Sequence, residues 1–303
     1  MTYSCTRVDD AEPEDEPVAE GVAMDGLPSP ERLLEIAISV ARPAADLAYR
    51  MRVDGVGGVS TKSTATDVVT AADRAVERQV IAALRELRPS DTVLGEEFGE
   101  GLSARPEGVS DSGQTRPAVR WVLDPIDGTV NYLYNLPQYA VSLAAEVAGV
   151  VVAGVVRNAV TGQEWTATLG GGAYTGGRRL TGSVETNLAQ ALIATGFGYG
   201  SERRAAQALV LAGLLPQVRD IRRFGAASID LCLAAEGRVD AYYEKGLNAW
   251  DHAAGGLVAA EAGLLVTGVN GAPPGPDLVI AAPPALYGPL HERLAALGAA
   301  DGP

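Results

Sequence analysis

The sequence predicts a layered α/β protein, and three observations support this fold class. Strand and helix patterns alternate along the second half of the chain, from about residue 188 onwards. Three consecutive strand patterns occupy residues 140–168 with no helix between them, which predicts antiparallel neighbours. The chain has 303 residues, of which 47% are hydrophobic and 20% charged, so it can bury a large core as one domain or as two closely packed halves.

The N-terminus predicts an acidic, disordered tail over residues 1–27. Residues 1–25 hold eight acidic side chains against the single Arg7 and show no hydrophobic periodicity. The whole chain has 24 basic and 38 acidic residues, a net charge of 24 − 38 = −14. This balance argues against a nucleic-acid partner, because such a surface needs clustered Lys and Arg.

Two helices are expected at the start of a first half that spans residues 28–187. The Ser-Pro-Glu sequence at residues 29–31 gives a helix cap, a first-turn proline and an early acid, so the first helix begins there. Pro43 is expected to kink or interrupt this helix. The second helix opens at Thr70 and is stopped by Pro89.

Strands dominate the rest of the first half. One strand runs to Glu96, and the Gly-, Ser- and Pro-rich residues 98–118 predict a long loop between two site-bearing segments. The next strand covers residues 119–123 and ends at Asp124. Three further strands are expected at residues 140–147, 150–157 and 164–168.

The second half, residues 188–303, predicts strands that alternate with helices. The apolar runs between turn signals predict strands, and the 3.6-residue spacing of apolar positions predicts helices. The expected strands are residues 191–196, 219–224, 239–244 and 278–281, and the expected helices are residues 202–215, 227–236, 249–262 and 285–297.

Composition also bears on where the protein acts. No apolar run approaches the ~20 residues that span a bilayer, and the N-terminus is acidic rather than basic and then apolar, so we expect no membrane partner and a cytoplasmic location. The only cysteines are Cys5 and Cys232, which argues against a disulfide framework and excludes by count a zinc site made of cysteines.

The most informative segment is residues 121–129, where an apolar strand leads into Asp124 and Asp127 and then into a glycine turn. Two carboxylates with a backbone carbonyl between them suit a hard divalent cation such as Mg²⁺. Ligands in α/β sheets gather at the carboxyl ends of strands. Gly128 lets the backbone approach a phosphate oxygen at the start of a helix that opens with Thr129.

Two more acidic segments accompany this one, Gly95-Glu96-Glu97 and Trp250-Asp251-His252. Alone, each could be a strand end, a plain turn or the first acid of a helix. Together, over about residues 62–263, they resemble the inositol monophosphatase family of Mg²⁺-dependent small-molecule phosphatases. The resemblance implies an alternating αβαβα sandwich, two or three Mg²⁺ ions per site and a homodimer.

The resemblance also implies roles at the metal site. Asp124 would bridge two metals, the Ile126 carbonyl would bind one of them, and Asp127 would bind the other. Glu96 and Asp251 would complete the two sets of ligands.

Further roles concern catalysis and the substrate. Glu96 and Thr129 would orient the attacking water, and Asp73 would hold the Thr129 hydroxyl, although a plain first-turn helix acid is an equal reading of Asp73. Glu97 would act on the metals only indirectly, and Lys62 would have either a role at the site or a structural one. The residues expected to contact a small phosphorylated polyol are Asp127, Gly128, Thr129, Gly225, Ala227, Glu244 and Asp251.

Two other catalytic patterns are rejected. Cys232 and Arg238 have the spacing of a cysteine phosphatase, but they lie in a helical pattern without a glycine-rich phosphate cradle. His252 and His291 are the only histidines, and without a Gly-x-Ser-x-Gly elbow they do not indicate a Ser-His hydrolase.

The function expected from the resemblance is Mg²⁺-dependent hydrolysis of myo-inositol 1-phosphate by a metal-activated water, with inhibition by lithium. The same chemistry on fructose 1,6-bisphosphate, histidinol phosphate or adenosine 3′,5′-bisphosphate stays open, because the metal motifs do not choose among substrates. A non-catalytic role as a partner of the transcription machinery stays open as well.

Overall fold

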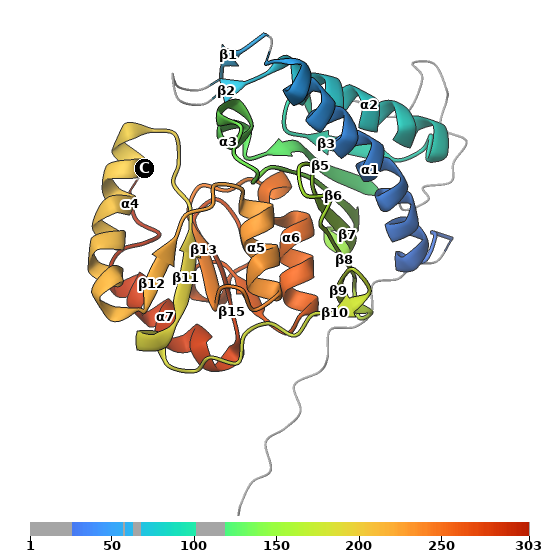
Figure 1. Ribbon diagram of the computed structural model, residues 1–303. Coiled ribbons are helices and arrows are strands. Elements are labelled where there is room, and N and C mark those ends of the chain that lie inside the picture. Colours follow the sequence, from blue (N-terminus) through green and yellow to red (C-terminus); the bar gives the residue numbers. More distant parts are fainter. Residues whose placement is uncertain (1–25, 57, 63–67, 101–118, 303) are drawn as a thin grey trace, which may run out of the picture.

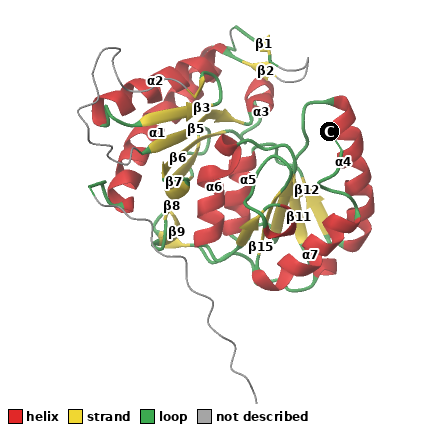
Figure 2. Ribbon diagram, turned by 180° about the vertical axis from the view of Figure 1, so that it is seen from behind, coloured by secondary structure: helices red, strands yellow, loops and turns green. Residues whose placement is uncertain are grey.

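The computed structural model describes residues 26–56, 58–62, 68–100 and 119–302. Its elements stack in five layers, helices on a sheet on helices on a second sheet on helices (Figure 1). The view from behind shows the same order, with α5 and α6 between the two sheets (Figure 2). The predicted layered α/β architecture is confirmed.

The larger sheet has eight strands in the order β10-β9-β8-β7-β6-β5-β3-β4. All neighbours pair antiparallel except β3 and β5, which run parallel. The strands are β3 (Thr92–Gly95), β4 (Gly99–Glu100), β5 (Arg120–Asp127), β6 (Ala140–Val147), β7 (Val150–Asn158), β8 (Glu164–Thr168), β9 (Gly172–Thr175) and β10 (Arg178–Arg179). A separate two-stranded ribbon pairs β1 (Ser60–Thr61) with β2 (Val68–Val69).

Helices α1 (Pro30–Asp54) and α2 (Ala71–Leu87) cover the outer face of the large sheet. Ser29 caps α1, and Thr70 caps α2 in a reciprocal capping box with Asp73. Of the two outcomes expected at Pro43, interruption does not occur, since α1 continues through this residue, and a kink there stays a prediction. The buried alanine-rich face of α1 packs against the sheet on both sides of Pro43, and this packing outweighs one lost backbone hydrogen bond.

Helices α5 (Ala227–Ala235) and α6 (Ala249–Glu261) form the middle layer. Every residue of α5 is buried, as expected for a helix covered on both sides. A short helix, α3 (Thr129–Tyr134), follows β5 directly.

The smaller sheet has five strands in the order β12-β11-β13-β15-β14. Strand β11 pairs parallel with both β12 and β13, whereas β15 pairs antiparallel with β13 and β14. Helices α4 (Ser201–Leu214) and α7 (Pro284–Ala296) cover its outer face. The strands are β11 (Leu192–Thr195), β12 (Asp220–Arg222), β13 (Ala241–Glu244), β14 (Leu265–Thr267) and β15 (Val279–Ala282).

Several strand predictions need correction. Strand β5 does not end at Asp124 but continues to Asp127 with an irregular register. Within the predicted loop at residues 98–118, Gly99 and Glu100 form β4 on the edge of β3. Six strands of two to four residues were not predicted, although the equally short β3, β11, β12, β13 and β15 were: β1, β2, β4, β9, β10 and β14.

Two earlier expectations lie mostly outside the described residues: the acidic tail and the loop at residues 98–118. The division of the chain near residue 188 stays a prediction, because α5 and α6 pack against both sheets. Within the described ranges, no helix is both long and apolar enough to cross a membrane.

Candidate active site

One cleft of about 730 Å³ brings together almost all of the predicted site residues. It lies where β5, α3 and the N-terminal ends of α5 and α6 meet the segment after β13. The predicted residues that line it are Lys62, Glu96, Asp124, Ile126, Asp127, Gly128, Thr129, Gly225, Ala227, Glu244 and Asp251. Asp73 and Glu97 are not among the lining residues and act on the cleft through neighbours.

The irregular end of β5 explains how two acids three residues apart reach the same cleft. Side chains alternate along a regular strand, so residues i and i+3 would face opposite sides of the sheet. Here Asp124 pairs with Ser142 and Asp127 with Ala140, so the ladder slips between them. The Ile126 N–H donates to Asp124 Oδ1 at 3.0 Å, which stabilises this bulge.

Asp127 joins the end of β5 to the start of α5. Its carboxylate accepts hydrogen bonds from the Ser228 N–H at 2.8 Å, the Ala227 N–H at 3.2 Å and the Ser228 hydroxyl. Burial raises the pKa of Asp127 to about 6, although the bonds from Ser228 oppose this rise. The N–H group of Ala227 is therefore engaged by Asp127, while Ala227 itself lines the cleft.

Gly128 lies at the point where these segments approach most closely. Its φ of 92° is in the left-handed region, which glycine adopts without strain. A Cβ atom there would come within 2.8 Å of the Gln138 carbonyl oxygen and 3.2 Å of the Gly225 carbonyl oxygen. Glycine thus permits the close turn that carries Asp127 and Thr129 into the cleft.

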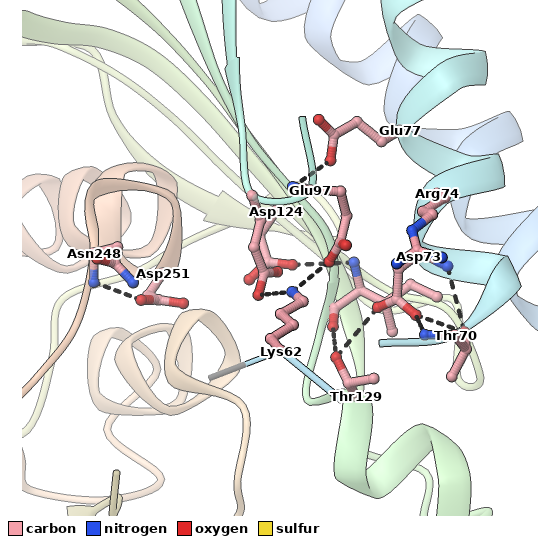
Figure 3. A network of polar contacts seen from close by, with 12 residues as sticks. Lys62, Thr70, Asp73, Arg74, Glu77, Glu97, Asp124, Thr129, Asn248 and Asp251 are labelled. Atoms are coloured by element: carbon pink, nitrogen blue, oxygen red, sulfur yellow. Dashed lines mark hydrogen bonds and ion pairs between the residues drawn. The ribbon is translucent and has the colours of Figure 1, made fainter. Parts of the chain in front are cut away.

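Lys62 binds the two consecutive acids Glu96 and Glu97. Its Nζ lies 2.7 Å from Glu96 Oε1 and also contacts the Glu97 carboxylate (Figure 3). Burial alone would lower the pKa of Lys62, but the two carboxylates raise it above its ordinary value. Glu77 of α2 fixes the turn, because its carboxylate accepts the Glu97 N–H at 2.9 Å. A structural contact and a place at the cleft are therefore both observed for Lys62.

Asp73 lies buried behind the cleft and contacts Thr129 (Figure 3). Its Oδ2 accepts the Thr70 N–H at 2.8 Å in the capping box, and its Oδ1 accepts the Thr129 hydroxyl at 3.2 Å. The Ile126 carbonyl also lies 3.1 Å from that hydroxyl, which has a single proton and so donates to one acceptor at a time. Asp73 therefore makes the expected contact with the Thr129 hydroxyl and is also an acidic residue in the first turn of α2.

Glu244 and Asp251 form the opposite wall, in the second half of the chain. Asp251 Oδ2 accepts the Asn248 N–H at 2.6 Å at the start of α6. Glu244 accepts the Tyr242 hydroxyl at 2.7 Å, and burial raises the pKa of Glu244 to about 7. Gly196 makes room for this carboxylate, since a Cβ atom there would lie 1.9 Å from Glu244 Oε2.

The acidic groups act on one another across the cleft. Burial, and then the nearby Glu96, Asp127 and Asp251 carboxylates, raise the pKa of Asp124 well above its ordinary value. Among the residues that the structure describes, no three Asp, Glu, His or Cys side chains converge as they stand on one ion position. Instead, each carboxylate accepts a hydrogen bond from the protein: Glu96 from Lys62, Asp127 from the start of α5, and Asp251 from Asn248. The donor types nonetheless fit a hard divalent cation, since they are carboxylates with the Ile126 carbonyl beside them.

These raised pKa values give a pH dependence of stability in the metal-free protein. Burial raises the pKa of Glu97 to about 7 and that of Asp127 to about 6. Between the ordinary and the raised values the folded state binds more protons than the unfolded state, so its stability falls as pH rises. In chelator we expect the melting temperature to drop from about pH 5 to about pH 8, and Mg²⁺ to reduce the drop. A melting temperature that climbs over this interval would contradict the assignment.

The structure adds cleft residues that the sequence reasoning missed. Arg203 and Arg223 line the wall on the side of Glu244, and the Arg223 guanidinium lies 5.9 Å from the centre of the Phe197 ring. Arg203 stands in the first turn of α4 after the glycine-rich residues 196–200, and that position could have indicated it. Nothing local in the sequence indicated Arg223.

The rejected catalytic patterns have structural explanations. Cys232 is buried in α5, and burial raises the pKa of its thiol well above the ordinary value. Burial also lowers the pKa of His252 to about 4, so its side chain is neutral at pH 7. His252 is not among the residues that line the cleft. His291 accepts the Asn270 N–H through Nε2 and stacks on Tyr287 of α7.

Comparison with known proteins supplies the deciding observation. The profile of the inositol monophosphatase family matches residues 29–299. The chain belongs to the inositol monophosphatase family. Its membership confirms the resemblance read from the three acidic segments.

Individual family members agree with this assignment. The inositol-1-monophosphatase of Mycobacterium leprae (strain TN) is 45% identical over 281 residues, 88% of this chain and 94% of the relative. A relative from Pseudomonas aeruginosa named Nus factor SuhB is 39% identical over 244 residues, 79% of this chain and 86% of the relative.

Solved structures of the family share the fold. Mycobacterium tuberculosis SuhB matches with a TM-score of 0.74 and 38% identity, over 90% of this chain and 99% of that one. The Thermotoga maritima IMPase matches with a TM-score of 0.76 and 26% identity, over 88% of this chain and 98% of that one.

Proposed function

We propose that this protein hydrolyses a small phosphate monoester with the help of Mg²⁺, and that the ester is myo-inositol 1-phosphate. One observation carries the proposal. Glu96, Asp124 and Asp127 from the first half and Asp251 from the second line one cleft, and neighbouring carboxylates raise the pKa of Asp124. Such a concentration of like charge is costly unless bound cations offset it.

Each acidic residue has a place in this scheme. Asp124, Asp127, Glu96, Asp251 and the Ile126 carbonyl would hold two or three Mg²⁺ ions. When bound, the ions would activate a water and stabilise the leaving oxygen in an in-line displacement. Glu96 and Thr129 would orient the water, and Asp73 would hold the Thr129 hydroxyl through their 3.2 Å contact.

The opposite wall would bind the polyol. Glu244 and Asp251 offer carboxylate oxygens to hydroxyl groups, and Gly225 and Ala227 give close approach to main chain. Gly128 and Thr129 would bring backbone N–H groups to the phosphate. The names of the mycobacterial relatives support inositol 1-phosphate as the first substrate to test.

Two other candidates have an observation in their favour. Arg203 and Arg223 line the cleft on the side of Glu244, and a guanidinium suits the second phosphate of a bisphosphate such as fructose 1,6-bisphosphate or adenosine 3′,5′-bisphosphate. A non-catalytic role in transcription is supported by the relatives named Nus factor SuhB from Pseudomonas aeruginosa and Escherichia coli. Histidinol phosphate has no such support beyond the shared metal chemistry.

A panel of phosphate monoesters, assayed with Mg²⁺ and with chelator, tests these ideas. The proposal expects Mg²⁺-dependent turnover of myo-inositol 1-phosphate with the highest kcat/KM of the panel. Preference for a bisphosphate would reassign the substrate, and turnover of none would favour the transcription role. A homodimer, a cytoplasmic location and inhibition by lithium remain predictions.

A further inference from the structure

Glu244 and Asp251 form the wall of the cleft that we propose binds the polyol, which we call the polyol wall. Lys245 follows Glu244 directly and makes an unusual set of contacts. Its side chain is only 8% exposed, although it carries a charge. The ammonium group donates to the carbonyl oxygens of Ala300, Asp301 and Gly302, at 2.8, 2.9 and 2.7 Å. Three donors thus meet three acceptors, which satisfies every N–H group of a buried lysine.

The same segment is tied to a second loop of the cleft. Gln207 of α4 donates from Nε2 to the Lys245 carbonyl at 3.3 Å, and its Oε1 accepts the Gly198 N–H at 3.0 Å. The Gly246 N–H donates to the Pro276 carbonyl at 2.8 Å. Residues 196–200 and 244–248 therefore form one braced wall, with the main chain of residues 300–302 behind it.

We propose that Lys245 and the carbonyls of residues 300–302 act as a clamp that positions the polyol wall, and so sets substrate affinity. Lys245 is a positioning residue in this scheme, because it acts through Glu244 and the following loop. The proposal rests on the proposed function for its kinetic consequence, but the clamp itself stands on the contacts just described.

The clamp should act on substrate binding rather than on the chemical step. Glu244, next to Lys245, faces the cleft from the end of β13, whereas Asp124, Thr129 and Asp73 belong to the first half of the chain. Loss of the ammonium group frees the loop after β13 but leaves the bulge of β5 and the start of α3 intact. We therefore expect KM to change much more than kcat.

The test uses two independent ways to remove the clamp. Lys245→Met keeps the aliphatic stem and removes the donors, while a chain that stops after Ala299 with a C-terminal amide removes the acceptors without adding a terminal carboxylate. Each is expected to raise the KM for myo-inositol 1-phosphate about tenfold and to change kcat less than about twofold. The double variant should be no worse than the worse single variant, because both changes remove the same contact.

Arg85→Met is the matched control, since it removes a positive charge from an exposed residue of α2 and should leave KM unchanged. Melting temperatures are recorded for all variants. A lower melting temperature with an unchanged KM in both single variants would show a merely structural role and overturn the proposal. Additive effects in the double variant would overturn it too.

Hydrogen exchange separates a failed clamp from a failed function. In the full-length wild type and the two single variants, the amides of residues 244–248 are followed by mass spectrometry. The clamp predicts exchange about tenfold faster in both variants than in wild type. If wild type turned over none of the esters, the proposed function would fail and exchange alone would decide. Unchanged exchange in both variants would then refute the clamp.

Discussion

Asp124→Asn is expected to lower turnover by about a thousandfold or more while leaving the fold intact. The substitution removes one charge without changing volume. Asp124 is buried at the centre of the acidic group, where it senses Glu96, Asp127 and Asp251. Without its charge, the cleft should bind divalent ions weakly and place them poorly. Steady-state kinetics at several Mg²⁺ concentrations would measure the loss.

The same variant should be more stable than wild type in chelator. Because burial and the neighbouring carboxylates raise the pKa of Asp124 well above its ordinary value, ionising this group costs more in the metal-free folded state than in the unfolded chain, and the neutral amide avoids this cost. Asp46→Asn on exposed α1 is the matched control and should change neither property. Near-normal turnover of Asp124→Asn would refute the assignment of Asp124.

Thr129→Val is expected to reduce kcat about a hundredfold with little change in KM. Valine has nearly the same shape but no hydroxyl, and the Thr129 hydroxyl contacts both Asp73 and the Ile126 carbonyl. A water aligned by this hydroxyl would lose its orientation. Thr129→Ser keeps the hydroxyl and should retain most of the activity, so the pair separates the chemical role from packing.

The melting temperature should also respond to the loss of the hydrogen bond between Thr129 and Asp73. The buried Asp73 carboxylate keeps its bonds from Thr70 in Thr129→Val but loses its partner on the cleft side. The melting temperature should therefore fall modestly in the valine variant and less in the serine variant. Equal kinetic damage in the two variants would mean that side-chain volume, and not the hydroxyl, determines the rate.

The layered fold could be predicted because its signals are local. Apolar spacing and helix caps mark α1 and α2, and alternation marks the second half. The two-residue strands β1, β2, β4 and β10 could not be found, since two residues carry no period. The absence of an interruption at Pro43 has a tertiary cause, because the buried face of α1 is long enough to keep the helix whole.

The candidate site was predictable where a motif sits next to a strand end or a helix start. Asp124, Asp127 and Asp251 all have that position. The contacts that join distant segments were not predictable from the sequence. Asp127 meets Ser228 across 101 residues, and Lys245 meets Ala300 across 55. The residues around each of these positions in the sequence do not indicate its partner, because such pairs depend on how the two sheets stack.

Anomalous diffraction from crystals grown with Mn²⁺ and inorganic phosphate tests the central claim most directly. We expect at least two manganese peaks in the cleft, each about 2.1 Å from oxygens of Glu96, Asp124, Asp127, Asp251 or the Ile126 carbonyl. Asp124 should touch two of them. Manganese found only elsewhere on the protein, with these four carboxylates bound solely to protein groups, would contradict the account.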